Sequence, residues 1–182
     1  MALGQFLSQR FGYGVHALAY IAKKPQGKLS TLPEVAAWMR TVWPEASETY
    51  LSNVVQRLAR GGLLRSHRGV TGGYSLARGA DEISLRDVVE LLEGVELDRC
   101  SLSLEGACHT AGRCTIQGKL RLLEEGYLRS MESLTISKLA DDIIVDENDE
   151  NLKKARRGRE YPPGQIPPSE VPRPTTPVES VK

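Results

Sequence analysis

The sequence predicts a mainly α-helical protein with a small β-hairpin wing: a winged helix-turn-helix region followed by a long dimerisation helix. Two observations support this fold class. Apolar residues recur at helical spacing in several segments. Two short extended runs flank the glycine-rich turn Gly69–Gly73, as expected for a hairpin. At 182 residues, the chain is long enough to bury a core of its own.

Two helices are predicted in the first forty residues. The first spans residues 7–23 and ends before Pro25 and Gly27. Thr31 and Glu34 have the spacing of a capping box, which predicts that a second, short helix begins there. The apolar residues of the first helix keep a helical period: Phe11, Val15, Leu18 and Ile21.

A third helix is predicted between an N-cap at Ser47 and a stop at Gly61. Its buried stripe comprises Leu51, Val54, Val55 and Leu58. The opposite face carries Thr49, Ser52, Asn53, Gln56, Arg57 and Arg60. On an isolated helix, such a face would simply be solvated. As the third helix of a helix-turn-helix arrangement, it is predicted to contact base edges and phosphates in the major groove of DNA.

The hairpin after the third helix is predicted to be a cationic wing. Its basic side chains are Arg65, His67, Arg68 and Arg78. A cationic wing can lie along the DNA backbone or enter the minor groove. The glycines do not indicate a nucleotide loop, because neither of the usual glycine motifs is present and the chain leaves the turn as a strand.

Charge is divided sharply along the chain. Residues 1–80 contain ten basic and three acidic side chains, whereas residues 81–150 contain seven basic and seventeen acidic ones. The balance returns to basic in residues 151–182, with seven basic and three acidic side chains. A basic first half suits a polyanionic partner, which favours DNA as the ligand of residues 1–80.

Residues 81–144 are predicted to form a cysteine-containing loop and a dimerisation helix. Ser84 and Asp87 resemble a second capping box, and Gly94 ends the short helix that follows. A long helix is then expected over residues 115–134. Its apolar stripe comprises Ile116, Leu120, Leu123, Tyr127, Met131 and Leu134. This stripe needs a partner, either its own domain or the same helix of a second subunit.

The three cysteines of the chain, Cys100, Cys108 and Cys114, fall within one short stretch. An odd, clustered set is a poor disulfide framework and a better set of metal ligands. Three thiolates can converge on an iron–sulfur cluster, leaving one coordination position to fill. Three alternatives remain open: a zinc site with His109, a thiol redox switch, and three unliganded cysteines.

Residues 145–182 are predicted to be a disordered, basic and proline-rich tail. Seven of the ten prolines lie between Pro162 and Pro177, and this stretch has few apolar side chains to bury. No apolar run in the chain approaches the length of a membrane span, and the N-terminus lacks the regions of a signal peptide. We therefore expect a cytoplasmic protein without membrane contact.

Three motifs together resemble the Rrf-two family of bacterial winged-helix transcription regulators, which includes IscR-, NsrR- and RirA-like members. They are YLSNVVQRLARGGLLRSHRGVTGGYSLAR, ISLRDVVELLEG and the three-cysteine loop, and the resemblance covers about residues 6–140. It implies a homodimer that binds a palindromic operator in double-stranded DNA. It also implies an iron–sulfur cluster, 2Fe–2S or 4Fe–4S, on Cys100, Cys108 and Cys114. We expect a repressor that senses iron, iron–sulfur or redox status.

The chain departs from this family at the position of the fourth cluster ligand. Gln117 stands where IscR has a histidine, and Gly12 stands nearest to the carboxylate used by some other members. His109, Glu105, His16 or a small molecule are the remaining candidates. The spacing of the cysteines is closer to the RirA-like pattern, which favours a cluster with one open iron.

The helix-turn-helix region departs from the family in two further places. The connection Met39–Ala46 is several residues longer than is usual, and Ser52 occupies a position that is often glutamate. The operator preference of relatives therefore does not transfer to this chain.

Two other classes of function fit the sequence less well. The winged fold could serve as a protein-interaction module, although the basic balance of residues 1–80 argues against this. An enzyme is not expected, because His16, His67 and His109 lie apart and no nucleophile motif surrounds them.

Overall fold

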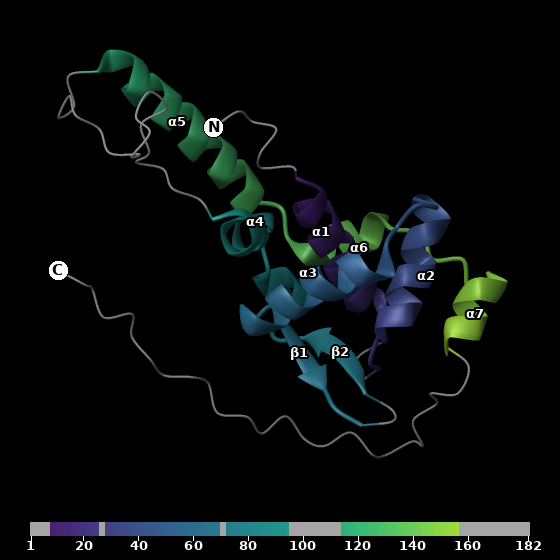
Figure 1. The fold of residues 1–182 in the computed structure, drawn as a ribbon. Coiled ribbons are helices and arrows are strands. Elements are labelled where there is room, and N and C mark those ends of the chain that lie inside the picture. The colour runs from purple at the N-terminus through teal and green to yellow at the C-terminus, as the bar shows by residue number, and fades with distance from the viewer. Residues whose placement is uncertain (1–7, 26–27, 70–71, 95–113, 157–182) are drawn as a thin grey trace.

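The computed structural model describes residues 8–25, 28–69, 72–94 and 114–156 (Figure 1). Within these ranges the chain is mostly helical, with one two-stranded antiparallel sheet, which confirms the predicted fold class. In chain order the elements are α1 (Gln9–Lys23), α2 (Leu32–Val42), α3 (Glu48–Arg60), β1 (Leu64–His67), β2 (Gly73–Leu76), the 3₁₀ turn η2 (Ala80–Glu82), α4 (Leu85–Glu93), α5 (Thr115–Glu132), α6 (Ile136–Asp142) and α7 (Glu150–Arg156).

Helix α1 lies at the centre of the fold and packs against α2, α3, α4, α6 and β2. The apolar periodicity read from the sequence explains this position, since Phe11, Leu18 and Ile21 are all buried. One core joins the helices and includes Trp38, Leu51, Leu58, Val88 and Leu92. None of the helices in the described ranges is both long and apolar enough to cross a membrane.

Both predicted capping boxes are present. The Glu34 backbone N–H donates to Thr31 Oγ1 at 3.3 Å, and the Glu34 carboxylate accepts from the Thr31 N–H in return. At the start of α4, the Ser84 N–H donates to Asp87 Oδ2 at 2.8 Å and the Asp87 N–H donates to Ser84 Oγ at 3.2 Å. These bonds satisfy N–H groups that a helix start leaves without internal partners, so both helices begin where the sequence predicted.

The wing is a hairpin in which Leu64 pairs with Leu76 and His67 pairs with Gly73. The wing is attached to the body by a β-bridge between Tyr74 of β2 and Ser30, which exchange backbone hydrogen bonds of 3.0 and 2.8 Å. Gly73 allows this close approach, because a Cβ atom there would lie 2.7 Å from the Ser30 carbonyl oxygen. The wing is therefore fixed to the segment that leads into α2.

The connection between α2 and α3 is shorter than predicted. Residues 39–42, which were assigned to a lengthened turn, continue α2 as helix, and Trp43 caps it. The remaining turn is held by Tyr13 of α1, whose hydroxyl accepts from the Ser47 N–H at 2.7 Å. The Tyr13 ring also meets the rings of Trp43 and Tyr50 edge-on, at centroid distances of 5.5 and 4.9 Å. The extra residues thus mainly lengthen α2.

Helix α5 projects from the body, and the chain then returns through α6 to pack on α1 (Figure 1). Two backbone bonds of 2.8 Å, Leu85 N–H to Leu134 O and Ile136 N–H to Ile83 O, join the end of α5 to the start of α4. Helix α6 was not predicted from the sequence. Its few residues are too short a window for an apolar period to be recognised.

The prediction that the chain is unfolded from residue 145 onwards is wrong for residues up to 156. Helix α7 packs on α2, and its Leu152 is buried in the core. Composition alone suggested a solvated basic run here. The prediction failed because a single leucine, supported by Arg156 contacts, anchors the helix. Residues 157–182, which hold the proline-rich stretch, lie outside the described ranges.

Candidate nucleic-acid interface and cysteine segment

Helix α3 has the amphipathic character expected of a recognition helix. Ser47 caps it by accepting the Tyr50 N–H at 3.3 Å. The predicted stripe Leu51, Val54, Val55 and Leu58 is buried in the core. Because this stripe faces inward, the polar row on the other side of the helix is directed outward.

The predicted polar row occupies that outer face. Its members are exposed except for Ser52, which is half-buried: Thr49, Asn53, Gln56, Arg57 and Arg60. Bonds along the helix link neighbouring members of the row. Gln56 Nε2 donates to Ser52 Oγ at 3.3 Å, and Arg60 Nε donates to the Gln56 carbonyl oxygen at 3.4 Å.

Arg57 differs from the rest of the row because its guanidinium reaches another helix. Arg57 Nη2 donates to the carbonyl oxygen of Leu92, near the C-terminus of α4, at 3.3 Å. A cation is favourable at a helix C-terminus, where carbonyl groups lack internal partners. The guanidinium has further N–H donors besides this one, and the residue remains exposed. No sequence pattern predicts this contact, because it joins residues far apart in the chain.

The wing carries two exposed arginines, Arg65 and Arg68. His67 is half-buried, and its Nε2 lies 2.9 Å from Ser75 Oγ across the hairpin. Arg78, predicted as another cation of the wing, instead pairs with Asp87 of α4 at 2.9 Å. Asp87 is also the N3 residue of the α4 capping box. Arg78 therefore helps to fasten the base of the hairpin to that helix.

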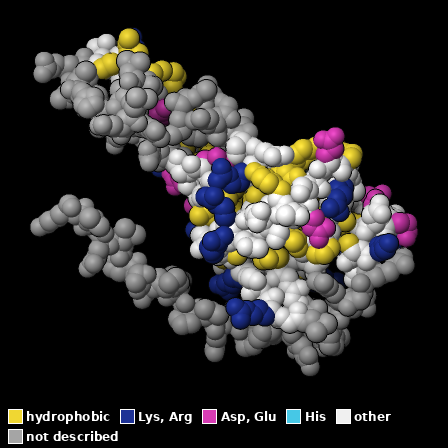
Figure 2. All heavy atoms as spheres, viewed as in Figure 1, with side chains coloured by type: hydrophobic (Ala, Val, Ile, Leu, Met, Phe, Trp, Pro, Cys, Tyr) yellow, Lys and Arg dark blue, Asp and Glu magenta, His cyan; other side chains and the backbone are white. Residues whose placement is uncertain are grey.

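Figure 2 shows lysine and arginine side chains running down one side of the body, from α4 past the end of α3 to the wing. The exposed arginines of α3 and the wing belong to adjacent elements, since α3 packs on β1. The basic character that the sequence predicted for residues 1–80 is thus displayed next to the polar row of α3. A basic surface beside such a row suits a DNA duplex, whose backbone lies on either side of the groove that a helix enters.

Of the three cysteines, only Cys114 lies within the described residues. It is the N-cap of α5, it is half-exposed, and its Sγ accepts the Gln117 N–H at 3.4 Å. Cys100 and Cys108 lie outside the described ranges, as do the candidate fourth ligands Glu105 and His109. Among the residues that are described, no three histidine, cysteine or acidic side chains form a metal-binding group.

The remaining candidate ligand, His16, is exposed on α1. Its Nδ1 lies 2.7 Å from the Gly12 carbonyl oxygen, and its ring centroid is 6.2 Å from that of Trp38. Both contacts are within α1 and α2, whereas Cys114 begins the helix that projects from the body (Figure 1). A half-exposed thiol can serve as one ligand of a thiolate-bound cluster.

The two halves of α5 differ in exposure. Ile116 and Leu123 are 70% and 71% exposed, whereas Leu128 and Met131 are only 2% and 5% exposed. The buried half meets α4, and Arg86 of α4 pairs with Glu132 at 3.1 Å. The first alternative for the apolar stripe, packing on its own domain, therefore holds for only part of it. The C-terminal half packs on its own domain, while the N-terminal half is exposed.

A polar row on the third helix, a fastened hairpin and a projecting helix together define a winged helix-turn-helix protein of the DNA-binding class. The model of the Rrf2 family, described as an iron-dependent transcriptional regulator, matches residues 7–142. The chain therefore belongs to the Rrf2 family of transcription regulators.

Solved structures with the same fold include two CymR proteins. CymR of B. subtilis, described as its global cysteine regulator, is 27% identical; the match covers 75% of this chain and 97% of CymR with a TM-score of 0.57. Staphylococcus aureus CymR is 28% identical, with 76% and 100% of the two chains covered and a TM-score of 0.55. IscR of T. potens is 24% identical. The match covers 76% of this chain and 92% of IscR with a TM-score of 0.56, which supports the fold.

Proposed function

We propose that this Rrf2-family regulator is a homodimeric repressor that senses iron, iron–sulfur or redox status through an iron–sulfur cluster bound by Cys100, Cys108 and Cys114. The observation that carries this proposal is the concentration of all three cysteines just before α5, in a chain matched by the model of an iron-dependent regulator family. Three thiolates are ligands that iron–sulfur clusters use.

The proposed DNA contacts divide between base edges and phosphates. Ser52, Asn53, Gln56 and Arg57 face the major groove, where amide and guanidinium groups can read adenine and guanine. Thr49 and Arg60 lie on the same outward row and contact the flanking backbone. The wing residues Arg65, His67 and Arg68 follow the adjacent backbone or minor groove. The exposure of the row and of the wing arginines supports this assignment.

The proposed dimer forms through the exposed half of α5. Ile116, Leu120 and Leu123 lie on one face and are 70%, 39% and 71% exposed. Burying one such side chain contributes about 1.5–3 kcal/mol, so pairing with the same face of a second subunit is favourable. A two-fold dimer would place two α3 helices on a palindromic operator about one helical turn apart.

The proposed coupling runs from Cys114 to α3 through packed helices. Ligation of Cys114 fixes the first turn of α5. The other end of α5 is joined to α4 by the Arg86–Glu132 pair, and the C-terminal end of α4 accepts the Arg57 hydrogen bond. When bound, the cluster supplies a reversible reaction with oxidants or a response to iron supply. Its loss then alters the position of α4 relative to α3.

Anaerobic purification tests the sensor. The protein is isolated without oxygen, and its visible absorption, iron and acid-labile sulfide are measured on the same sample. Equal iron and sulfide in a brown protein support the proposal, and their amount per subunit separates 2Fe–2S from 4Fe–4S. A colourless protein that still lacks iron and sulfide after reconstitution overturns it.

A second candidate is a clusterless regulator that responds through its thiols. Two similarities favour this alternative: B. subtilis CymR is described as a global cysteine regulator, and S. aureus CymR, at 27% identity, was solved in an oxidised form. A zinc site that includes His109 is the other clusterless form. In either case the iron and sulfide assay is negative. Zinc analysis and thiol titration before and after mild oxidation then distinguish the two.

A further inference from the structure

Helix α7 lies beyond the part of the chain that the Rrf2 model matches, which ends at residue 142. It is nevertheless tightly attached to the DNA-binding region. Leu152 is 1% exposed and belongs to the same core as α1 and α2. The segment before α7 is attached as well, since Trp38 Nε1 donates to the Ile144 carbonyl oxygen at 3.0 Å.

The strongest attachment is a buried charge cluster centred on Glu34 of α2. Arg156 Nε pairs with Glu34 Oε1 at 2.7 Å, and Arg156 Nη2 donates to Tyr20 Oη at 3.0 Å. Lys24 also pairs with Glu34, and Glu147 pairs with Arg156 on the outer side. A carboxylate buried this deeply needs cationic partners. The end of α7 is thereby fixed beside the first turn of α2.

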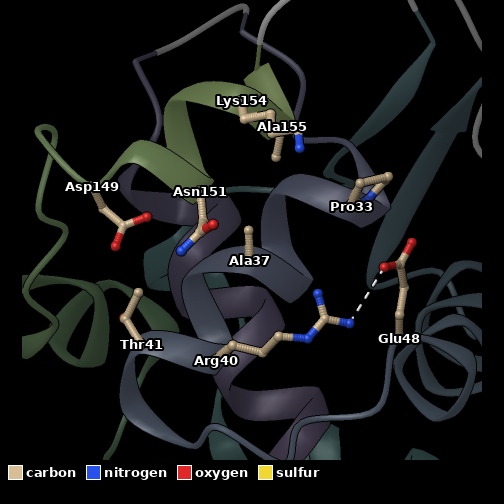
Figure 3. Close-up of a pocket in the computed structure, with 9 residues that line it drawn as sticks. All are labelled: Pro33, Ala37, Arg40, Thr41, Glu48, Asp149, Asn151, Lys154 and Ala155. Atoms are coloured by element: carbon tan, nitrogen blue, oxygen red, sulfur yellow. Dashed lines mark hydrogen bonds and ion pairs between the residues drawn. The ribbon is translucent and has the colours of Figure 1, made fainter.

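This attachment creates a groove of about 710 Å³ between α7 and α2 (Figure 3). Pro33 lies at the first turn of α2, and Glu48 lies at the first turn of α3, so the groove borders the start of both helices. Its lining includes Pro33, Ala37, Arg40, Glu48, Lys154 and Ala155. In a helix-turn-helix protein, the first of the two helices crosses the DNA backbone while the second enters the major groove. With the proposed DNA contacts of α3, a phosphate backbone would therefore pass near this edge.

The charged side chains that line the groove differ in whether they have a partner. Glu48 is paired with Arg40 at 3.5 Å, and Asp149 accepts the Leu152 N–H at 2.8 Å as the cap of α7. The neighbouring Lys153, which does not line the groove, is paired with Glu150 at 3.1 Å. Lys154 is exposed, and within the described part of the chain it makes no ion pair or hydrogen bond. It is thus the cation in this groove that is available to a phosphate.

We propose that α7 extends the DNA-binding surface of this protein, with Lys154 contacting a phosphate that flanks the segment read by α3. This inference rests on the proposed DNA contacts of α3 and the wing. Lysine suits a phosphate contact of this kind, since its ammonium acts as a point charge without a fixed bidentate geometry. The contact carries no sequence information and adds to affinity for any duplex.

The test compares Lys154→Ala with Lys153→Ala, a matched control that removes the same charge from the adjacent, paired position. The DNA is a duplex enriched by the wild-type protein from a random-sequence library, and binding is measured by fluorescence anisotropy over a range of salt. Loss of one phosphate contact lowers the logarithmic salt slope by about 0.9, which corresponds to about a five-fold loss of affinity at 0.15 M salt. Lys154→Ala is expected to show this loss and Lys153→Ala is not.

Other outcomes separate this inference from the function on which it depends. Wild-type protein that enriches no duplex would overturn the DNA contacts and this inference together. If the wild type binds and Arg68→Ala weakens binding, but Lys154→Ala equals Lys153→Ala, then only the inference fails. Leu152→Asp, checked for retained helicity by circular dichroism, releases α7. In that background, Lys154→Ala should have no further effect, and a further five-fold loss would contradict the role of docking.

Discussion

The Arg57 guanidinium of the recognition helix donates a hydrogen bond of 3.3 Å to the Leu92 carbonyl oxygen at the end of α4. Arg57 is therefore expected to have two roles. It faces outward beside the other proposed base-reading residues, and it also joins α3 to the helix that carries α5. Any shift of α4 relative to α3 therefore acts on Arg57 directly.

Substitution of Arg57 tests its role in recognition. Arg57→Ala is expected to weaken operator binding by about 1–3 kcal/mol, because a bidentate contact to guanine is lost. Binding to unrelated DNA should change much less. Fluorescence anisotropy with both duplexes measures the difference. Arg57→Lys keeps the charge but not the planar fork, and full recovery of specificity by lysine would show that Arg57 does not read a base.

Arg68 at the wing is expected to act without regard to sequence. Arg68→Ala should lower affinity for specific and unrelated DNA by a similar factor and reduce the salt slope by about 0.9. Lys138→Ala on α6 is the control, since its ammonium donates to the Ser133 carbonyl oxygen at 2.8 Å. An unchanged slope for Arg68→Ala, or an equal change for both variants, would exclude the wing from the interface.

The proposed dimer depends on the exposed face of α5. Leu123→Asp is expected to convert the dimer to a monomer in sedimentation equilibrium, because a carboxylate would be buried in the interface without a partner. Leu122→Asp is a matched control. Leu122 is also exposed, at 63%, but its position on the helix is turned away from the stripe of Ile116, Leu120 and Leu123. Monomers in both cases, or dimers in both, would contradict this interface.

The buried cluster around Glu34 gives the fold a defined response to acid. Burial raises the pKa of Glu34, but hydrogen bonds and charge from Lys24 and Arg156 outweigh it, so the pKa lies below the ordinary value of glutamate. A depressed pKa stabilises the folded protein at neutral pH, and this stability is lost as the pH falls through the folded-state pKa. Glu34→Gln should therefore lower the free energy of unfolding by about 1–3 kcal/mol at pH 7.

Urea denaturation of the wild type and of Glu34→Gln over a range of pH measures this difference. The gap between the two proteins should narrow as the pH falls below the ordinary glutamate pKa. Asp87 also has a lowered pKa, the net result of burial, which raises it, and of stronger bonds from Ser84 and Arg78. The contribution of Asp87 to the free energy of unfolding is the same in both proteins, so it cancels in the difference between them. A gap that stays constant with pH would show that Glu34 stabilises the fold by packing alone.

Much of the fold could be predicted because its signals are local. Capping boxes at Thr31 and Ser84, the apolar stripe of α3 and the hairpin turn each depend on residues close in sequence. Contacts between distant segments could not be predicted in this way. The bond from Arg57 to Leu92, the pair of Arg78 and Asp87, and the attachment of α7 to Glu34 depend on tertiary packing, which leaves no periodic trace in a single sequence.

In the candidate site too, local features could be predicted from the sequence and others could not. The polar row of α3 follows from helical geometry once Leu51 and Leu58 are assigned to the core. The sequence predicts that the connection between the second and third helices begins at Met39, whereas α2 continues to Val42. The cluster ligands rest on composition and on family membership, since of the three cysteines only Cys114 falls in the described part of the chain.

The cysteine set can be tested without DNA. Cys108→Ala is expected to abolish iron and sulfide loading. The protein should remain dimeric, because Leu120 and Leu123 of the dimer face lie beyond the first turn of α5. Iron analysis and sedimentation on the same sample measure both properties. Stoichiometric iron in Cys108→Ala would remove this residue from the ligand set.

Control of DNA binding by the cluster is best tested by measuring the affinity of cluster-loaded and cluster-free dimers for one operator duplex, anaerobically and at one salt concentration. The two affinities are expected to differ by a coupling of about 1–3 kcal/mol, or roughly 5–150-fold. Cys108→Ala, which lacks the cluster, should match the cluster-free form. Equal affinities for the loaded and cluster-free dimers would contradict the claim that this regulator reads its signal through Cys100, Cys108 and Cys114.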